Sequence, residues 1–481
     1  MRLSWRQSEW ALPAWLRATH RYLLLAPRRV VLAGLGCMAL AASSDIANTF
    51  DSPRRGAAGP AVALFVTLAL AFACFFAAAR RPLPLLIRRH RRLTRLLIYP
   101  VLLWSVFTAY QTCGILLQGS VEALTTRHVQ YGSDDLYDNH FNALLVLHGR
   151  NPYTNTDLAA EARYFGERAF TPIRRGQFSD PRRYPTQAEM DAVMDAYLAH
   201  TESPPPELDP RTLHSYPAGA FLVDVPLVWA GLPSVAIAQI ALFVLLVAAI
   251  CAASPPAWRP LIALLALATA DGARQATGGD FEIWPLAFVM GAWLLRERRI
   301  GSAVLLGAAC AIKQTAWLAA PFYLIWVWRE HGRAEALKRT VLAVGTFLAI
   351  NGPWIALSPR AWLESLLLPV SLPLLPDGSG IIALSLTGVL PLLPPLIYSL
   401  LELAALAGAL VWYWRRLPRY PYAGLVLPLL PLLLAWRSSE RYFVLLPLAA
   451  LLAVALTLRV GRGFASYRGS GDAPERIMPK T

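Results

Sequence analysis

The stretch RRPLPLLIRRHRRLTR, residues 80–95, leads directly into LLIYPVLLWSVFTAYQTCGILL, residues 96–117. The second stretch carries no charged side chain, and a helix over it rises about 1.5 Å per residue, enough to cross the hydrocarbon core of a bilayer. Arginine-rich loops stay on the cytoplasmic side of membranes. We therefore predict that residues 80–95 are cytoplasmic and that a helix over 96–118 ends on the opposite side.

The whole chain repeats this alternation of apolar runs and short arginine clusters. Of its 481 residues, 56% are hydrophobic and only 16% are charged, which is typical of a membrane protein. The net charge of +15 lies mostly between the apolar runs, as in cytoplasmic loops, and does not indicate a nucleic-acid partner. The five cysteines all lie in apolar runs without metal-type spacing, so we expect buried free thiols. These features predict an all-α polytopic membrane protein.

Apolar segments define the topology. They are 30–44, 61–79, 96–118, 216–231, 234–253, 260–270, 283–295, 300–314, 315–328, 338–357, 388–414, 421–436 and 441–458. If 216–231 crossed the membrane, the basic clusters 296–299 and 328–333 would lie outside the cell. If 216–231 lies along the outer surface, every later cluster becomes cytoplasmic, and Asp224 also suits an interfacial helix. We therefore predict about twelve transmembrane helices, external juxtamembrane helices and cytoplasmic chain ends.

Four parts result from this topology. Residues 1–29 form a basic cytoplasmic segment at the membrane interface, and 30–95 add two transmembrane helices and the basic loop. Residues 96–458 form the membrane core, with a large external loop over 119–233. Residues 459–481 form a polar, disordered cytoplasmic tail.

The external loop begins with a cluster of acids, YGSDDLYDNHF, residues 131–141. A helix is predicted from Leu136 to Leu147, because His148-Gly149 and Asn151-Pro152 resemble a C-cap and a turn. Asp134 and Asp135 precede this helix. They either form a solvated turn or an N-cap, or one of them acts as a general base beside the bilayer.

The spacing from Asp135 through Gly149 to Asn151-Pro152-Tyr153 resembles the first-loop motif of GT-C glycosyltransferases, in the branch that uses polyprenyl-phosphate-mannose. Four later stretches resemble motifs of the same branch, in the same order: Ser215-Tyr216-Pro217, the Gly-rich 278–284, Ala311 to Thr315, and Arg441-Tyr442 through Pro447. The resemblance covers about 96–458. It departs from the family in the two preceding helices, the long insert 154–213, Asn139 in place of a Tyr, and Ala218 in place of a Pro.

The resemblance implies a GT-C-like fold and a membrane glycosyltransferase of the bacterial plasma membrane with an extracytoplasmic active site. The donor would be a polyprenyl-phosphate-linked sugar, with mannose expected, and the acceptor a glycolipid, a polysaccharide or a protein. Asp135 would be the general base, with Asp134 as a second carboxylate that raises its pKa, or as the base itself. No cofactor would be required.

Three cations are candidate ligands of the donor phosphate. Lys313 is expected at the outer end of 300–314, where the alternative is a lysine whose ammonium snorkels to the surface. Arg274 lies in the second external loop. Arg441 begins the last crossing, next to Glu440. The two side chains either pair with each other or line the donor site.

Seven residues are candidate acceptor or sugar contacts: Tyr137, Asn139, Tyr153, His214, Tyr216, Asp280 and Glu282. Asp280 and Glu282 either assist the acceptor, hold a divalent cation together with Asp135, or belong to a solvated turn. The histidines share no metal-ligand spacing, so we predict no metal site. The insert 154–213 is either a cap that faces the acceptor or a solvated loop.

Two other functions remain open from the sequence. A polymerase or ligase of surface polysaccharide also uses an external loop and scattered arginines. A transporter of lipids or solutes is the alternative from another class, although transporters place ionisable residues near the bilayer midplane and often show repeated halves.

Overall fold

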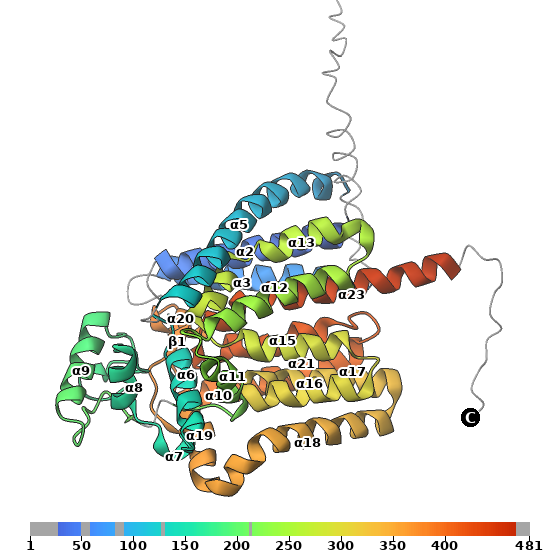
Figure 1. Ribbon diagram of the computed structural model, residues 1–481. Helices are drawn as coiled ribbons and strands as arrows, with labels where there is room; N and C mark the ends of the chain where they lie inside the picture. Colours follow the sequence, from blue (N-terminus) through green and yellow to red (C-terminus); the bar gives the residue numbers. More distant parts are fainter. Residues whose placement is uncertain (1–26, 50–57, 82–90, 127–129, 211–213, 468–481) are drawn as a thin grey trace, which may run out of the picture.

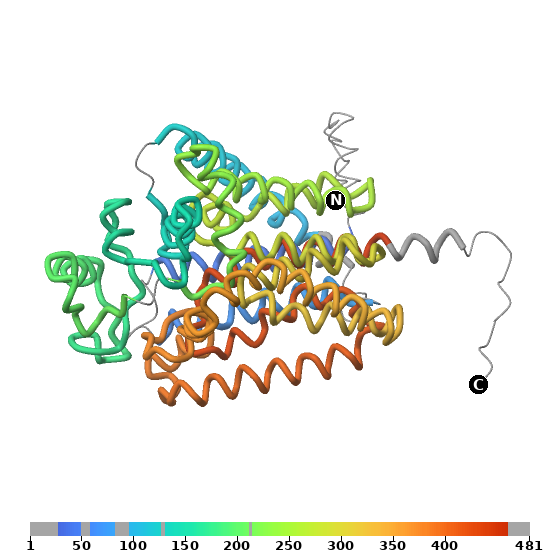
Figure 2. Tube along the Cα trace, turned by 60° about the horizontal axis from the view of Figure 1, so that its bottom comes forward, coloured from blue at the N-terminus to red at the C-terminus, as the bar shows by residue number. Residues whose placement is uncertain are grey.

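The computed structural model describes residues 27–49, 58–81, 91–126, 130–210 and 214–467, and these are mostly helical, with almost no strands. The predictions for residues 1–26 and for the end of the tail, 468–481, lie outside the described residues. Figure 1 shows long helices that run roughly parallel, and short helices that gather at one end of the bundle. We call this the site end, and the tube in Figure 2 shows the same segregation.

Within the described residues, seven helices are long and apolar enough to cross a membrane. They are α2 (Arg28–Thr49), α3 (Ala58–Ala79), α5 (Arg91–Thr125), α12 (Ala236–Ala253), α18 (Arg333–Leu357), α21 (Pro395–Arg416) and the helix that begins at Arg441 and continues as α23 (Leu446–Tyr467). Shorter helices run between them: α13 (Arg259–Leu267), α15 (Ile283–Leu294), α16 (Arg299–Ile312) and α17 (Thr315–His331). The helical class is therefore confirmed, and the seven helices are consistent with a membrane protein, whereas twelve crossings and a GT-C-like fold stay predictions.

The remaining elements are short. The helices are α6 (Asp134–Leu147), α7 (Pro152–Asn155), α8 (Leu158–Phe165), α9 (Gln187–Ala199), α10 (Gly219–Leu222), α11 (Val225–Trp229), α14 (Ala270–Arg274), α19 (Pro359–Ser371), α20 (Ile381–Leu386) and α22 (Arg441–Val444). Single turns are η1 (Gly176–Phe178), η3 (Pro256–Trp258), η4 (Gln275–Gly279), η5 (Ala423–Leu425), η6 (Leu427–Leu429) and η7 (Pro431–Leu434). Strand β1 (Asp377–Gly378) pairs in parallel with β2 (Arg437–Ser438).

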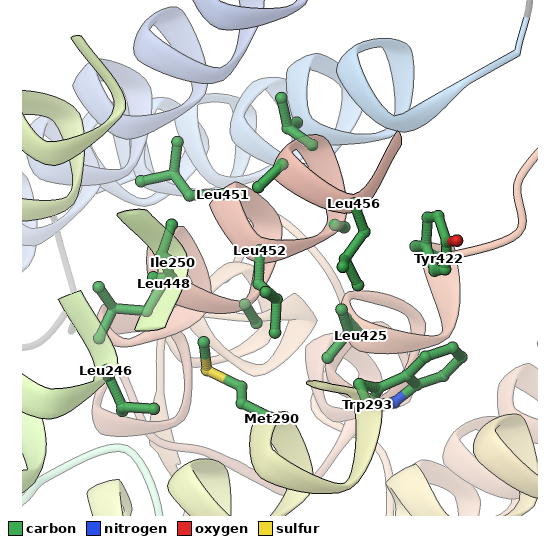
Figure 3. Close-up of a cluster of buried hydrophobic side chains, with 14 of the residues drawn as sticks. Leu246, Ile250, Met290, Trp293, Tyr422, Leu425, Leu448, Leu451, Leu452 and Leu456 are labelled. Atoms are coloured by element: carbon green, nitrogen blue, oxygen red, sulfur yellow. The ribbon is translucent and has the colours of Figure 1, made fainter. Parts of the chain in front are cut away.

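Helix α23 forms the centre of the bundle. The membrane-crossing window of Arg441–Arg459 is 83% buried, as expected for a helix that is apolar all round. Figure 3 shows Leu448, Leu452 and Leu456 of α23 among side chains of α12, α15 and η5. In contrast, α5, α18 and α21 leave large apolar side chains exposed on their outer faces, such as Leu103, which is consistent with contact to lipid.

Four local predictions are wrong. The segment 421–436 is not one helix but the turns η5 to η7, since Pro428 and Pro431 remove backbone donors. Segment 216–231 forms the two short helices α10 and α11 in place of one interfacial helix, with Asp224 between them buried in the protein, and its position along the outer surface stays a prediction. Helix α23 continues to Tyr467, past the start of the predicted disordered tail. All five cysteines are free, but only Cys37 is buried, whereas Cys74, Cys251 and Cys310 are half-buried and Cys113 is exposed.

Candidate functional site

Ser133 begins the helix that carries the two adjacent acids. It is the N-cap of α6, and its Oγ accepts a hydrogen bond from the backbone N–H of Asp135 at 3.3 Å. The helix therefore starts two residues before the predicted Leu136, with Asp134 and Asp135 in its first turn. Negative side chains there are stabilised by the helix dipole and by unpaired N–H groups. The predicted end holds, because His148 is the C-cap.

Asp135 is held by side chains from two other segments. Tyr216 donates its hydroxyl to Oδ1 at 2.6 Å, and Lys313 places Nζ 3.0 Å from Oδ2. The Lys313 ammonium also lies over the Tyr216 ring, 4.7 Å from its centroid. Three of the residues that the sequence predicted are thus brought together.

Lys313 lies at the centre of a cluster of carboxylates. It is the C-cap of α16, and its Nζ is 3.0 Å from Asp135, 3.0 Å from Glu282 and 3.6 Å from Asp280. The side chain is 6% exposed, so it does not snorkel to the surface. Thr315 fixes Glu282 by donating to its Oε2 at 3.0 Å. Asp280 and Glu282 are buried, which excludes the solvated turn.

Two glycines allow these segments to approach each other. Gly278 adopts φ +121°, a conformation that only glycine adopts readily, and its carbonyl accepts from the N–H of Gly132 at 2.7 Å. This contact brings Asp280 next to the start of α6. A Cβ on Gly219 would lie 2.4 Å from the carbonyl oxygen of Ala311. Only glycine therefore lets α10 pack on the end of α16.

Burial and the neighbouring charges shift the pKa values of the cluster in opposite directions. Burial raises the pKa of Asp135, but Lys313, Tyr216 and other partners outweigh it and leave this pKa below its usual range. The expected rise caused by Asp134 is therefore wrong. Burial raises the pKa of Asp280 to about 7, against the opposing effect of Lys313. The site thus combines an ionised Asp135 with a more basic Asp280.

The two arginines line a polar hollow at the site end. Its volume is about 550 Å³, and its wall includes Arg274, Arg441, Asp271, Asp377, Glu440 and Gly132. Arg441 donates to Ser133 Oγ at 2.9 Å and to the Gly132 carbonyl at 3.3 Å, which ties the hollow to the start of α6. Arg441 was expected either to pair with Glu440 or to line the donor site with it. Among the described residues no ion pair joins the two side chains, and both of them line the hollow.

Arg274 differs from Arg441 in its surroundings. It is paired with Asp271, yet 58% of its side chain remains exposed. Arg274 is the last residue of α14, and the π-helical turn η4 follows it directly. Turns of this kind occur often at functional sites.

The insert is a folded cap and not a solvated loop. Residues of α8, α9 and the turns between them form their own apolar cluster, which includes Phe178 and Met194. Trp436 donates to the Leu374 carbonyl at 3.1 Å, and Leu374 forms a β-bridge with Ile173 of the insert. Its residues 184–186 form one wall of the polar hollow.

Four predicted sugar contacts are buried behind the cluster. Tyr137 accepts from the N–H of Tyr131 at 2.6 Å, Asn139 donates to the Asp135 carbonyl at 2.7 Å, and Tyr153 donates to the Tyr216 carbonyl at 3.0 Å. These three side chains therefore help to hold α6 and Tyr216 in place. Their contacts with a sugar stay predictions.

The fourth, His214, belongs to a network that the sequence did not reveal. Its Nδ1 lies 3.0 Å from Asp138 Oδ2, and Asn142 donates to the other oxygen of Asp138 at 2.7 Å. Burial lowers the pKa of His214 to about 3, so the ring is neutral. The four-residue spacing of Asp138 and Asn142 on α6 was the available signal.

Asp134 is directed away from the cluster, toward the insert. Thr171 donates to its Oδ2 at 2.6 Å. In the described part of the chain, no group of three or more His, Cys, Asp or Glu side chains is arranged to hold a metal ion. Asp135, Asp280 and Glu282 instead share the ammonium of Lys313.

Comparison with protein-family models, curated proteins and solved structures found no match. The family assignment therefore stays a resemblance, and an inference about function depends on the geometry of this site.

Proposed function

We propose that the chain transfers a sugar, mannose by the resemblance, from a polyprenyl-phosphate donor to a glycan, glycolipid or protein acceptor at the extracytoplasmic face. The observation that carries this proposal is the Asp135 carboxylate, held by Lys313 and Tyr216 at the end of an apolar bundle. Its side chain remains 20% exposed, so an acceptor hydroxyl can reach it.

The reaction is an inverting displacement. The acceptor oxygen forms a bond to the anomeric carbon of the sugar, and the bond from that carbon to the phosphate oxygen breaks. The polyprenyl phosphate departs with the electron pair, and the acceptor proton passes to Asp135. A carboxylate has about four lone-pair sites, of which Tyr216 and Lys313 occupy two. The remaining sites accept the proton.

The cluster sets the charge of the base. Lys313 has its ammonium occupied by carboxylates, so we assign it to keeping Asp135 ionised rather than to the donor phosphate. Arg441 and Arg274 line the open hollow, and guanidinium groups bind phosphate oxygens in bidentate fashion. We assign the phosphate contact to these two arginines.

The transporter alternative fits this geometry less well. Transporters place their ionisable residues near the middle of the membrane. Here the buried charges of the cluster lie at one end of the bundle, at the end of α16 and the start of α6 (Figure 1).

The direct test is transfer by the purified protein in nanodiscs with radiolabelled polyprenyl-phosphate-mannose and a panel of acceptor glycolipids. We expect label in a product of inverted anomeric configuration. Transfer from another polyprenyl-phosphate sugar, with mannose inert, would reassign the sugar. Polymerisation of a lipid-linked oligosaccharide instead would identify the polymerase or ligase, and movement of intact lipid without transfer would identify a transporter.

A further inference from the structure

A second hollow, of about 320 Å³, lies between α2 and α5. It is completed by residues 268–272, by Arg274 and by Val444 and Pro447. Asp271, Arg274 and Val444 also line the polar hollow, so the two spaces meet at shared walls. The second hollow is therefore adjacent to the polar hollow at the site end.

The polarity of this second hollow changes along both helices. On α2 the lining passes from Cys37, Leu40 and Ala41 to Ser44 and Asp45. On α5 it passes from Trp104 and Phe107 to Thr108 and Gln111. Both helices run toward the site end (Figure 1), so the apolar part lies deeper in the bundle and the polar part lies next to Arg274.

The hollow also borders the outer surface of the bundle. Phe107 lines it and has 62% of its surface exposed, and Leu103, one turn earlier on the same helix, is 74% exposed. In a membrane this face of α5 contacts hydrocarbon chains. A lipid chain can therefore enter beside α5 without crossing water.

The polar hollow offers groups of both signs. Arg274 and Arg441 suit a phosphate, while Asp377, Glu440 and Asp271 suit sugar hydroxyl groups, which donate hydrogen bonds to carboxylates. A phosphate alone would meet three acids there, so the mixed lining favours a phosphate that carries a sugar.

We infer that the joined hollows bind a lipid-linked phosphosugar, with its hydrocarbon chain between α2 and α5 and its phosphate at Arg274 and Arg441. This inference rests on the proposed function and identifies the path of its donor. It also gives α2, which lies before the part that resembles the family, a role as one wall of the binding site.

The test measures lipid binding, separately from transfer. A polyprenyl phosphate with a photoreactive group in its chain is cross-linked to the wild-type protein in nanodiscs, and the labelled peptides are mapped. We expect labels on α2 and α5. Labels confined to other helices would overturn the inference, and so would labels on α2 and α5 that excess unlabelled lipid does not displace. If the protein binds the lipid at α2 and α5 but transfers no sugar, the labelling result still stands. Failure of the proposed function can therefore be distinguished from failure of this inference.

A matched pair of variants tests the same path by affinity. Ala41→Trp fills the apolar part of the hollow, whereas Ala63→Trp adds the same side chain to an exposed position of α3. We expect Ala41→Trp to weaken binding of polyprenyl phosphate about ten-fold, which is the affinity that the burial of roughly two methylene groups provides. Ala63→Trp should leave binding unchanged. A short-chain isoprenyl phosphate should bind both variants equally. Equal affinities of both variants for the long lipid would refute the path.

Discussion

At the scale of single residues, Asp135 explains why so apolar a chain places acids beside a membrane helix. Its carboxylate is buried in part, yet Tyr216 and Lys313 stabilise its charge. Hydrogen bonds to ionised groups are worth about 1.5–3 kcal/mol, so each partner matters to the reaction.

Replacing Tyr216 by Phe removes the hydrogen bond to Oδ1 of Asp135 and leaves the ring under Lys313. We expect kcat for sugar transfer to fall about ten-fold or more, with donor binding unchanged. The matched control is Tyr398→Phe, which removes a buried hydroxyl that donates to Ser385 at 2.8 Å, away from the cluster. Equal kcat values for the two variants would contradict the role of Tyr216.

Replacing Lys313 by Gln removes the cation that lowers the pKa of Asp135. Burial and the two other acids then raise this pKa, so the carboxylate is protonated at higher pH. We expect the acidic limb of the kcat/KM profile to move to higher pH by the same amount. The exposed Lys338→Gln variant is the control. A uniformly slower reaction with an unmoved profile would show that Lys313 does not tune Asp135.

At the scale of elements, the site depends on close packing of α10 on the end of α16. Gly219→Val places a side chain against the Ala311 carbonyl and displaces α10, and with it Tyr216. A shift of about 1 Å costs on the order of a hundred-fold in rate. Gly345→Val is the control, because a Cβ there meets no atom within 4 Å. Both variants are compared by transfer rate and by elution from gel filtration, and full activity of Gly219→Val would disprove the packing argument.

The elements themselves were largely predictable from sequence. Apolar runs and arginine clusters located the long helices, and the Gly-Arg-Asn-Pro stretch after His148 marked the end of α6. In the run 421–436, Pro428 and Pro431 were the available signal that no regular helix forms there.

The cluster itself was not predictable in the same way. Asp135 and Lys313 are 178 residues apart, and no periodic pattern reports that such residues meet. Their contact results from tertiary packing through Gly132, Gly278 and Gly219. The sequence predicted Lys313 as a phosphate ligand because position alone does not reveal that three acids surround its ammonium.

At the scale of the whole molecule, α5, α18 and α21 have exposed apolar faces, and the short helices gather at one end of the bundle (Figure 1). These two features predict a membrane protein with a fixed orientation. In a cysteine-free background, Ser203→Cys lies in the insert and Ala334→Cys at the opposite end, and both positions are exposed. We expect a membrane-impermeant maleimide to label only Ser203→Cys on intact cells. The reverse pattern would place the site in the cytoplasm.

The most direct measurement compares sugar transfer and donor binding for Asp135→Asn, with Asp191→Asn of α9 as a control of the same chemistry. Asparagine keeps the shape of the side chain but cannot take the proton. We predict a loss of turnover of at least about a hundred-fold with donor affinity retained, and a normal rate for the control. Turnover by Asp135→Asn at the rate of the unchanged protein would contradict the account.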